Sequence, residues 1–321
     1  MLLLVGAGCG SSESPPSSST VTDALGRTVE LERPVERVVS LAPNLTELAV
    51  AAGGGPRLVA VTTADDFPPA VDTLDRISAL PVDFEAVAAQ RPDLVLATDQ
   101  VNPPGDTETF DTLDVPVYFF SFGALTDVFD AIETMGTLFG TQTAATDTVR
   151  ALNERVARLE ARTGTIPPGE RPRVLVLIGD ETLYSFGAGS YVHRLVALAG
   201  GRSITDTLGT EAPTLSEEFV LTQKPDVIVG AWGPDYDPSR LLRLHPTWDV
   251  VPAVKNGRVY SLPPSLLLRP GPRLVQGARR MAARLHPDRV EAPGPPRPEG
   301  DTTASASAAA RSSSPAPRPS P

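Results

Sequence analysis

Cysteine and histidine are scarce in this chain of 321 residues, which has one cysteine, Cys9, and three histidines. A disulfide within the chain, a cysteine-based zinc site and an iron–sulfur cluster are thereby excluded, because each needs several thiolates at one point. His193, His245 and His286 stand 52 and 41 residues apart, so no pair has the helical spacing of a transition-metal site. We expect no resident metal and no cofactor.

Positive charge is also in deficit. The chain has 28 basic and 39 acidic residues, which gives a formal net charge of −11 and an isoelectric point near 4.8. Binding of nucleic acid without sequence preference depends on basic residues that displace counterions from phosphates. This composition argues against a nucleic-acid partner.

The apolar run at the N-terminus is short. Met1–Gly8 would span about 12 Å as a helix, whereas a bilayer core is about 30 Å thick. Cys9 and a polar stretch rich in serine and proline follow it. This order resembles the end of a bacterial lipoprotein signal, which predicts lipidation of Cys9 and a flexible tether. The alternative is an incidental thiol in a disordered leader.

The middle of the chain alternates short β-branched runs with helical patterns, which is typical of parallel α/β layers. Seven strands are predicted, and they fall into two groups. The first group is Arg37–Leu41, Leu58–Val61, Leu94–Ala97 and Val117–Phe120, and the second is Val174–Ile178, Val227–Val229 and Arg258–Ser261.

Two segments of the first group return in the second. Glu85–Ala97 matches Glu218–Gly230 without a gap, and Thr46–Gly54 matches His193–Gly201. Both matches hold in residue type at most positions. The chain therefore consists of two related lobes.

A long amphipathic helix is predicted between the lobes, over Ala145–Arg162. Its apolar residues Val149, Leu152, Val156 and Leu159 are three and four apart and share one helical face. We expect an α/β fold of two Rossmann-like lobes with parallel central sheets, joined by one bridging helix, with a ligand cleft between them. The expected segments are a signal remnant and tether (1–21), an N-terminal lobe (22–140), the bridging helix (141–165), a C-terminal lobe (166–288) and a disordered tail (289–321).

Several motifs, in a consistent order, resemble one family. They are Arg37–Glu47, Asp66–Pro69, Gln90–Val95, His245–Trp248, Lys255–Tyr260 and Arg269–Arg273. Together they resemble the helical-backbone substrate-binding proteins of ABC importers, which take up cobalamin, ferric siderophores and haem. The resemblance covers about residues 22 to 287, and Phe67–Pro69 and Arg269–Arg273 are most similar to the cobalamin-binding branch.

The resemblance implies a monomeric receptor outside the cytoplasm, lipid-anchored to the membrane, that captures a bulky metal chelate. The implied partners are a permease dimer and its cytoplasmic ATPase, and no catalysis is implied. A corrinoid is the expected ligand. Ala64, Leu80, Thr98 and Ala212 stand where the cobalamin branch often has aromatic residues, so a haem or ferric-siderophore receptor stays the alternative.

Ligand-binding residues are expected after the strands, where parallel sheets place their sites. Polar loops follow two strands of the first lobe, and aromatic residues follow strands of the second, where they suit a flat ligand. An arginine before a proline-locked turn is either a salt-bridge partner or a ligand donor. The candidates are Thr63, Asp65, Phe67, Thr98, Tyr184, Phe186, Trp232 and Arg269.

Other residues have structural explanations. Asn44 and Glu47 have the spacing of a capping box at a helix start, and Trp248 is expected in the core. Glu85 and Glu218 occupy equivalent places just after the capping residues of two helices, where an acid also complements the helix dipole. In the family that the chain resembles, a surface glutamate of each lobe meets arginines of the two permease subunits, which assigns Glu85 and Glu218 to docking.

Two rival functions remain. An α/β hydrolase or nucleotide enzyme would need a site that the sequence does not display, since there is no Gly-x-Ser-x-Gly elbow and no phosphate loop. An adhesion module would not need two lobes around a cleft.

Overall fold

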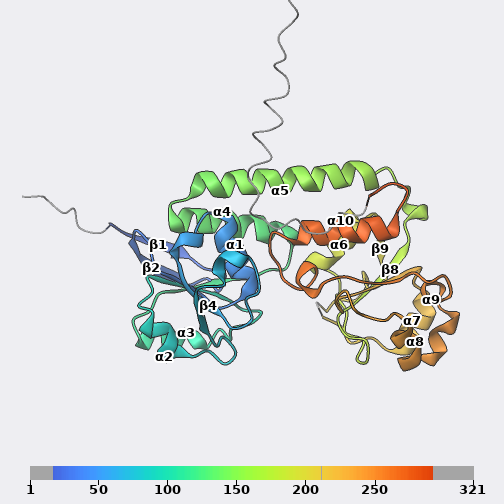
Figure 1. The fold of residues 1–321 in the computed structure, drawn as a ribbon, viewed down its shortest axis with the longest axis horizontal. Coiled ribbons are helices and arrows are strands. Elements are labelled where there is room, and N and C mark those ends of the chain that lie inside the picture. Colours follow the sequence, from blue (N-terminus) through green and yellow to red (C-terminus); the bar gives the residue numbers. More distant parts are fainter. Residues whose placement is uncertain (1–16, 211, 292–321) are drawn as a thin grey trace, which may run out of the picture.

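The computed structural model describes residues 17–210 and 212–291. It confirms two α/β lobes with parallel sheets, lying side by side beneath one long helix (Figure 1). Cys9 and residues 292–321 lie outside the described residues. Residues 17–21, which were predicted as the end of a tether, belong to strand β1 (Ser17–Thr22).

The N-terminal lobe contains a parallel sheet in the order β5-β4-β3-β6-β7. The chain enters at a central strand, β3, and moves outward in both directions, as in doubly wound folds. The strands are β3 (Val38–Ser40), β4 (Leu58–Thr62), β5 (Asp75–Ile77), β6 (Leu94–Thr98) and β7 (Val117–Phe120). The helices are α1 (Pro43–Ala51), α2 (Phe84–Ala89), α3 (Asp106–Thr112) and α4 (Leu125–Phe139).

The C-terminal lobe has a smaller parallel sheet in the order β11-β10-β8-β9. Its strands are β8 (Arg173–Leu177), β9 (Arg202–Ser203), β10 (Val227–Gly230) and β11 (Val259–Ser261). Its helices are α6 (Tyr191–Leu198), α7 (Glu217–Gln223), α8 (Ser239–Leu244), α9 (Pro252–Lys255) and α10 (Leu274–Leu285).

The bridging helix is α5 (Gln142–Thr163), which begins three residues before the predicted start. The left-handed Gly140, with φ of 69°, ends α4 immediately before it. Val149, Leu152 and Leu159 are buried on the predicted apolar face. In Figure 1, α5 runs across both lobes.

Sequence patterns missed the short strands β5 and β9 and the antiparallel hairpin of β1 with β2 (Thr28–Arg33). The turn of this hairpin depends on Asp23, whose carboxylate accepts hydrogen bonds from the backbone of Leu25 and Arg27, each at 3.0 Å. Ala24 N donates to Phe119 O at 2.9 Å, which attaches the turn to strand β7. A hydrogen bond between residues so far apart in the chain leaves no local pattern in the sequence.

The two copies of the repeat have the same local structure at the amino ends of the sheets. Asp93 N donates to Arg37 O, and Asp226 N donates to Arg173 O, both at 2.8 Å. The residue two places earlier is left-handed in each copy, with φ of 47° at Arg91 and 46° at Lys224. The repeat in sequence therefore corresponds to a repeat in backbone conformation.

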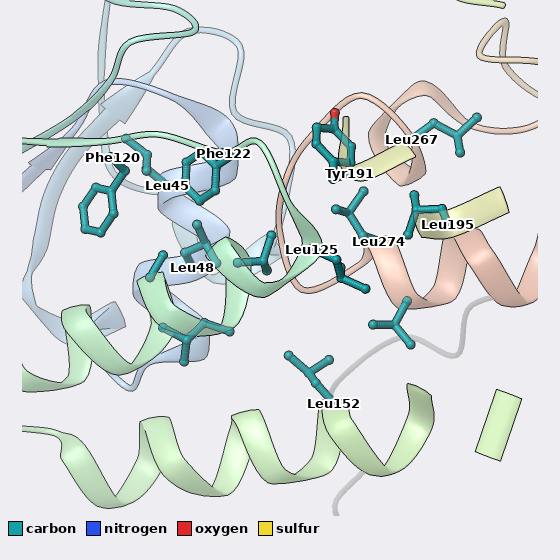
Figure 2. Close-up of a cluster of buried hydrophobic side chains, with 14 of the residues drawn as sticks. Leu45, Leu48, Phe120, Phe122, Leu125, Leu152, Tyr191, Leu195, Leu267 and Leu274 are labelled. Carbon is teal, nitrogen blue, oxygen red and sulfur yellow. The ribbon is translucent and has the colours of Figure 1, made fainter. Parts of the chain in front are cut away.

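A continuous group of buried apolar side chains joins the two lobes (Figure 2). Each sheet also has a second apolar group on its other face that belongs to its own lobe, and Trp248 is fully buried in that of the C-terminal lobe, as predicted. The shared group includes Leu45, Leu48, Phe120, Phe122, Leu125, Leu152, Tyr191, Leu195, Leu267 and Leu274. The lobes are thus held together by packing as well as by helix α5.

Candidate functional site

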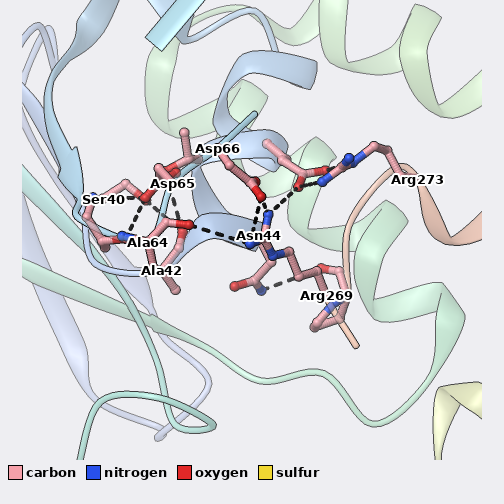
Figure 3. A network of polar contacts seen from close by, with 12 residues as sticks. Ser40, Ala42, Asn44, Ala64, Asp65, Asp66, Arg269 and Arg273 are labelled. Atoms are coloured by element: carbon pink, nitrogen blue, oxygen red, sulfur yellow. Dashed lines mark hydrogen bonds and ion pairs between the residues drawn. The ribbon is translucent and has the colours of Figure 1, made fainter. Parts of the chain in front are cut away.

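The loops that leave the carboxyl ends of the two sheets meet through a cluster of ion pairs (Figure 3). We call Glu47, Asp66, Arg269 and Arg273 the interlobe cluster. Both acids belong to the N-terminal lobe, and both arginines follow β11 in the C-terminal lobe. Residues more than 200 positions apart are therefore adjacent at the junction of the lobes.

Glu47 lies at the centre of the interlobe cluster, with its side chain only 2% exposed. Arg273 donates to it twice, from Nε at 2.8 Å and from Nη2 at 2.5 Å. Burial raises the pKa of Glu47, although the hydrogen bond and charge of Arg273 act in the opposite direction. Arg273 is therefore the main group that compensates a buried carboxylate.

The capping box predicted for Asn44 and Glu47 is wrong. Helix α1 begins at Pro43 with Ala42 as its N-cap, and no side chain caps it. Asn44 instead lies inside the first turn, where its Nδ2 donates to Pro270 O at 3.5 Å. Proline at the first helical position fixes the backbone and has no N–H that needs an acceptor, so both side chains are free to reach the other lobe.

Arg269 forms an ion pair with Asp66 of the opposite lobe. A second contact joins Arg269 Nη2 to Asp66 Oδ2 at 3.4 Å, and Arg269 Nη1 lies 3.9 Å from Glu47. Arg269 was expected to be either a salt-bridge partner or a ligand donor, and in the structure it forms a salt bridge. Asp66 lies in the polar loop after β4 that was expected to line the cleft, but no periodicity links it to position 269.

The loop after β4 carries three predicted site residues. Thr63 is exposed, whereas Asp65 is buried and its Oδ2 accepts hydrogen bonds from Thr62 N at 2.8 Å and Thr62 Oγ1 at 2.7 Å. Phe67 is half-buried under the guanidinium of Arg273, which is 4.1 Å from the ring centroid. In this loop Thr63 is thus the freely exposed candidate, and Asp65 and Phe67 have partners within the protein.

Thr98 differs from the other candidates because its side chain is fully buried at the end of β6. Its backbone N–H donates to Asn102 Oδ1 at 3.2 Å. The next residues, Asp99 and Gln100, are exposed. The sequence placed the strand end at Ala97, one residue early, and therefore assigned Thr98 to the loop.

The aromatic candidates of the C-terminal lobe have unequal exposure. Tyr184 is 48% exposed, whereas Phe186 is partly buried and packs on Tyr191 with ring centroids 6.1 Å apart. Trp232 is half-buried, and its ring lies 4.1 Å from that of Tyr236. Tyr236, which sequence reasoning missed, therefore extends the aromatic surface at the end of β10.

Glu85 and Glu218 lie at matching positions in the first turns of α2 and α7. The preceding caps are present in both, since Asp83 accepts from Ala86 N at 3.0 Å and Ser216 from Phe219 N at 3.1 Å. Both glutamates are exposed.

Among the described residues, no group of three or more His, Cys, Asp or Glu side chains could hold a metal ion. No helix in the same part of the chain is long and apolar enough to cross a membrane. The arrangement offers carboxylates and guanidinium groups at the junction of the two lobes, and aromatic faces at the carboxyl ends of strands in the C-terminal lobe.

The chain is similar to known binding proteins over most of its length. It is 26% identical over 274 residues, 84% of this chain and 86% of the relative, to the uncharacterized ABC transporter substrate-binding lipoprotein YvrC of Bacillus subtilis. It is 28% identical over 244 residues, 75% of this chain and 86% of the relative, to the vitamin B12-binding protein of Vibrio parahaemolyticus.

A solved structure shares the architecture. A periplasmic haem-binding protein from Pseudomonas aeruginosa superimposes with a TM-score of 0.71 at 25% identity, over 79% of this chain and 94% of that one. The names of these proteins describe binding proteins, one of them of an ABC transporter, which argues at the family level against the rival enzyme. Residues 38–266 match the family described as periplasmic binding protein. The chain therefore belongs to the periplasmic binding protein family.

Proposed function

We propose that this protein is the receptor of an ABC importer and captures a corrinoid between its two lobes. One observation supports this most directly: loops from the carboxyl ends of both sheets meet at the ion pair of Arg269 with Asp66. A ligand there would touch both lobes, and a bulky chelate is large enough to do so.

The aromatic residues favour a flat ligand. Tyr184 and the Trp232–Tyr236 pair all follow strands of the C-terminal lobe. Aromatic faces contribute about 0.5–1.5 kcal/mol per pair beyond the area that they bury. The ligand would stack on this side and meet the polar loop at Thr63 on the other, with Asp65, Phe67, Thr98, Phe186 and Arg269 shaping the site from behind.

Haem is the second candidate, because Tyr184 presents a largely exposed phenol. Tyrosine is one of the side chains that hold haem iron in proteins. A haem receptor would lose its iron–phenolate absorption in Tyr184→Phe, whereas corrinoid binding would tolerate the loss of one hydroxyl.

The test is the visible spectrum of the protein purified from its host, followed by titration with cyanocobalamin, haem and a ferric siderophore. Corrinoid, haem and iron–catecholate differ in colour. We expect saturable binding of cyanocobalamin. Binding of haem alone would support the second candidate, and binding of none of the three would reject both.

The permease would dock on Glu85 and Glu218. Helices α2 and α7 both lie on the side of the molecule opposite α5 (Figure 1), and like charges on two related lobes suit a two-fold partner. Charge reversal at both positions should abolish transport and leave chelate affinity unchanged. Glu154→Lys on α5 is the control, since Glu154 is also exposed but lies on the helix at the opposite side. Intact transport in the double variant would leave only helix capping as their role.

The receptor would be held outside the cytoplasm by a lipid on Cys9, as the similarity to a lipoprotein suggests. Cys9→Ser should release the protein from membranes. Membrane retention of this variant would contradict the anchor.

A further inference from the structure

The loops at the carboxyl ends of the strands have an unusual charge composition. We call them the rim loops, and they are residues 63–74, 78–83, 99–105, 121–124, 178–190, 204–210, 212–216, 231–238 and 262–273. In these described segments ten residues are acidic and two are basic, Arg269 and Arg273. An anionic ligand that enters between the lobes would find only these two guanidinium groups among the rim loops.

Both arginines already have acidic partners. Arg273 is bonded to Glu47 at 2.8 and 2.5 Å and lies over the ring of Phe67. Arg269 is paired with Asp66, and its second contact to the same carboxylate is 3.4 Å long. Each guanidinium is thereby occupied within the described protein before a ligand arrives.

The two pairs differ in accessibility. Glu47 is 2% exposed, so replacement of its partner would disturb the junction of the lobes. Asp66 is 65% exposed and Arg269 is 24% exposed, so the Asp66–Arg269 pair borders solvent. Removal of the Asp66 carboxylate would free the guanidinium of Arg269 for a ligand. The buried carboxylate of Glu47 would keep its partner.

We propose that Asp66 is a specificity-determining residue, which occupies Arg269 and so makes the site prefer neutral or cationic chelates over anionic ones. Arginine recognises carboxylates through two parallel hydrogen bonds. In this protein Asp66 occupies the donors of Arg269 that would form them. Four other acids of the rim loops, Asp72, Asp180, Glu181 and Asp237, are paired with arginines outside these loops. Repulsion toward a negative ligand would therefore come from the remaining acids. This inference rests on the proposed function, since it assumes that the chelate binds at the rim loops.

The charge state of Asp66 supports the same mechanism. Burial acts to raise the pKa of Asp66, but the hydrogen bond and charge of Arg269 outweigh it, and the pKa lies below its ordinary value of 3.8. The carboxylate is therefore ionised at every pH at which an importer works.

The test compares two ligands of one shape that differ by one charge. Cyanocobalamin is neutral overall, and hydrolysis of one side-chain amide yields a carboxylate of nearly the same size. The wild-type protein should bind the carboxylate about tenfold more weakly than cyanocobalamin, and Asp66→Asn should remove most of that difference. Calorimetry at low salt measures both affinities.

Two variants control for unspecific loss of charge. Asp237→Asn removes another exposed rim acid, paired with Arg243 at 3.1 Å, and should leave the affinity ratio unchanged. In Asp66→Asn/Arg269→Gln the recovered affinity for the carboxylate should disappear. Thermal unfolding confirms that each variant folds.

Equal affinity of the wild type for both ligands would overturn the inference, and so would an equal response of Asp66→Asn and Asp237→Asn. If neither corrinoid binds, the proposed corrinoid function is rejected independently of the role of Asp66. The same comparison is then made between a cationic ferric trihydroxamate and a ferric tricatecholate, and a charge preference that Asp66→Asn does not reduce rejects the role of Asp66.

Discussion

The same sequence segment ends differently in the two lobes. Leu94–Ala97, which is part of β6, and Val227–Gly230, which is β10, are equivalent and buried. The first continues into Thr98 and Asp99, and the second into Ala231 and Trp232. At their amino ends the two strands have equivalent backbone hydrogen bonds. At their carboxyl ends, polar side chains follow the strand in one lobe and aromatic side chains follow it in the other. Duplication thus preserved the end that builds the fold and diversified the end that forms the candidate site.

The largest expected effect concerns the junction that unites the lobes. Arg273→Met should lower the free energy of unfolding by about 3–5 kcal/mol, because it leaves the buried carboxylate of Glu47 without its main partner. Chemical denaturation measures the loss. Arg243→Met is the matched control, since its partner Asp237 is exposed and surface pairs contribute at most about 1 kcal/mol.

Glu47→Gln combined with Arg273→Met should recover much of the lost stability, because no buried charge remains. If Arg273→Met destabilises the protein no more than Arg243→Met, the interlobe cluster does not hold the lobes together. Helix α5 and the shared apolar group would then be sufficient.

The next largest effect is expected at the carboxyl end of β10, where Trp232 lies over Gly230. A Cβ atom at Gly230 would lie 2.1 Å from the ring of Trp232, so Gly230→Ala must displace the indole or the strand. We expect a loss of about 1–3 kcal/mol, the usual effect of overpacking. The change is measured by denaturation and by tryptophan fluorescence.

Trp248 is the other tryptophan and is fully buried elsewhere in the lobe, so Gly230→Ala/Trp248→Phe isolates the signal of Trp232. The double variant Gly230→Ala/Trp232→Ala should regain part of the stability. Unchanged stability and fluorescence in Gly230→Ala would show that Trp232 is not packed across the end of β10.

A smaller effect separates the aromatic side of the site from the polar side. Tyr184→Ala should weaken chelate binding by about 0.5–1.5 kcal/mol and leave the unfolding temperature of the free protein nearly unchanged, because Tyr184 is largely exposed. Trp232→Ala should reduce both affinity and stability, since Trp232 also packs against the core of its lobe. Thr63→Ala is the comparison in the N-terminal lobe. Equal losses of affinity for Thr63→Ala and Tyr184→Ala would remove the distinction between the sides.

The smallest effect depends on pH. The hydrogen bond from Arg173 holds the pKa of Asp226 below its ordinary value of 3.8. A lowered pKa in the folded state stabilises the protein above that value, and the contribution is lost as the pH falls through the folded pKa. Asp226→Asn should flatten the acid side of the stability profile by less than about 1 kcal/mol, because the pair is partly exposed. An identical profile would show that the pair contributes nothing.

Periodicity and repetition in the sequence were sufficient to predict both lobes, the seven main strands and helix α5. These features depend on contacts between residues close in the chain. Strand alternation and the three-and-four spacing of apolar residues reflect the geometry of a single element. The repeat extended this reasoning, because the second copy confirmed the pattern of the first.

The loops in which site residues would lie could be predicted from the ends of those strands. The orientation of individual side chains could not, as the buried Thr98 beside the exposed Asp99 demonstrates. Strand β6 is buried on both faces through Thr98, and Asp99 is the first residue beyond it, so an error of one residue at the strand end reverses the assignment.

The tertiary structure alone decided the role of Glu47 and the partners of both arginines. The sequence by itself determined two lobes, their central strands and the helix that joins them, and it left Asn44 and Glu47 with the spacing of a helix cap. Only the folded chain brings Glu47 to Arg273 and Asp66 to Arg269, across more than 200 residues. The physical reason is that a buried carboxylate depends on the nearest cation in space, and spatial proximity at this separation leaves no local pattern in the sequence.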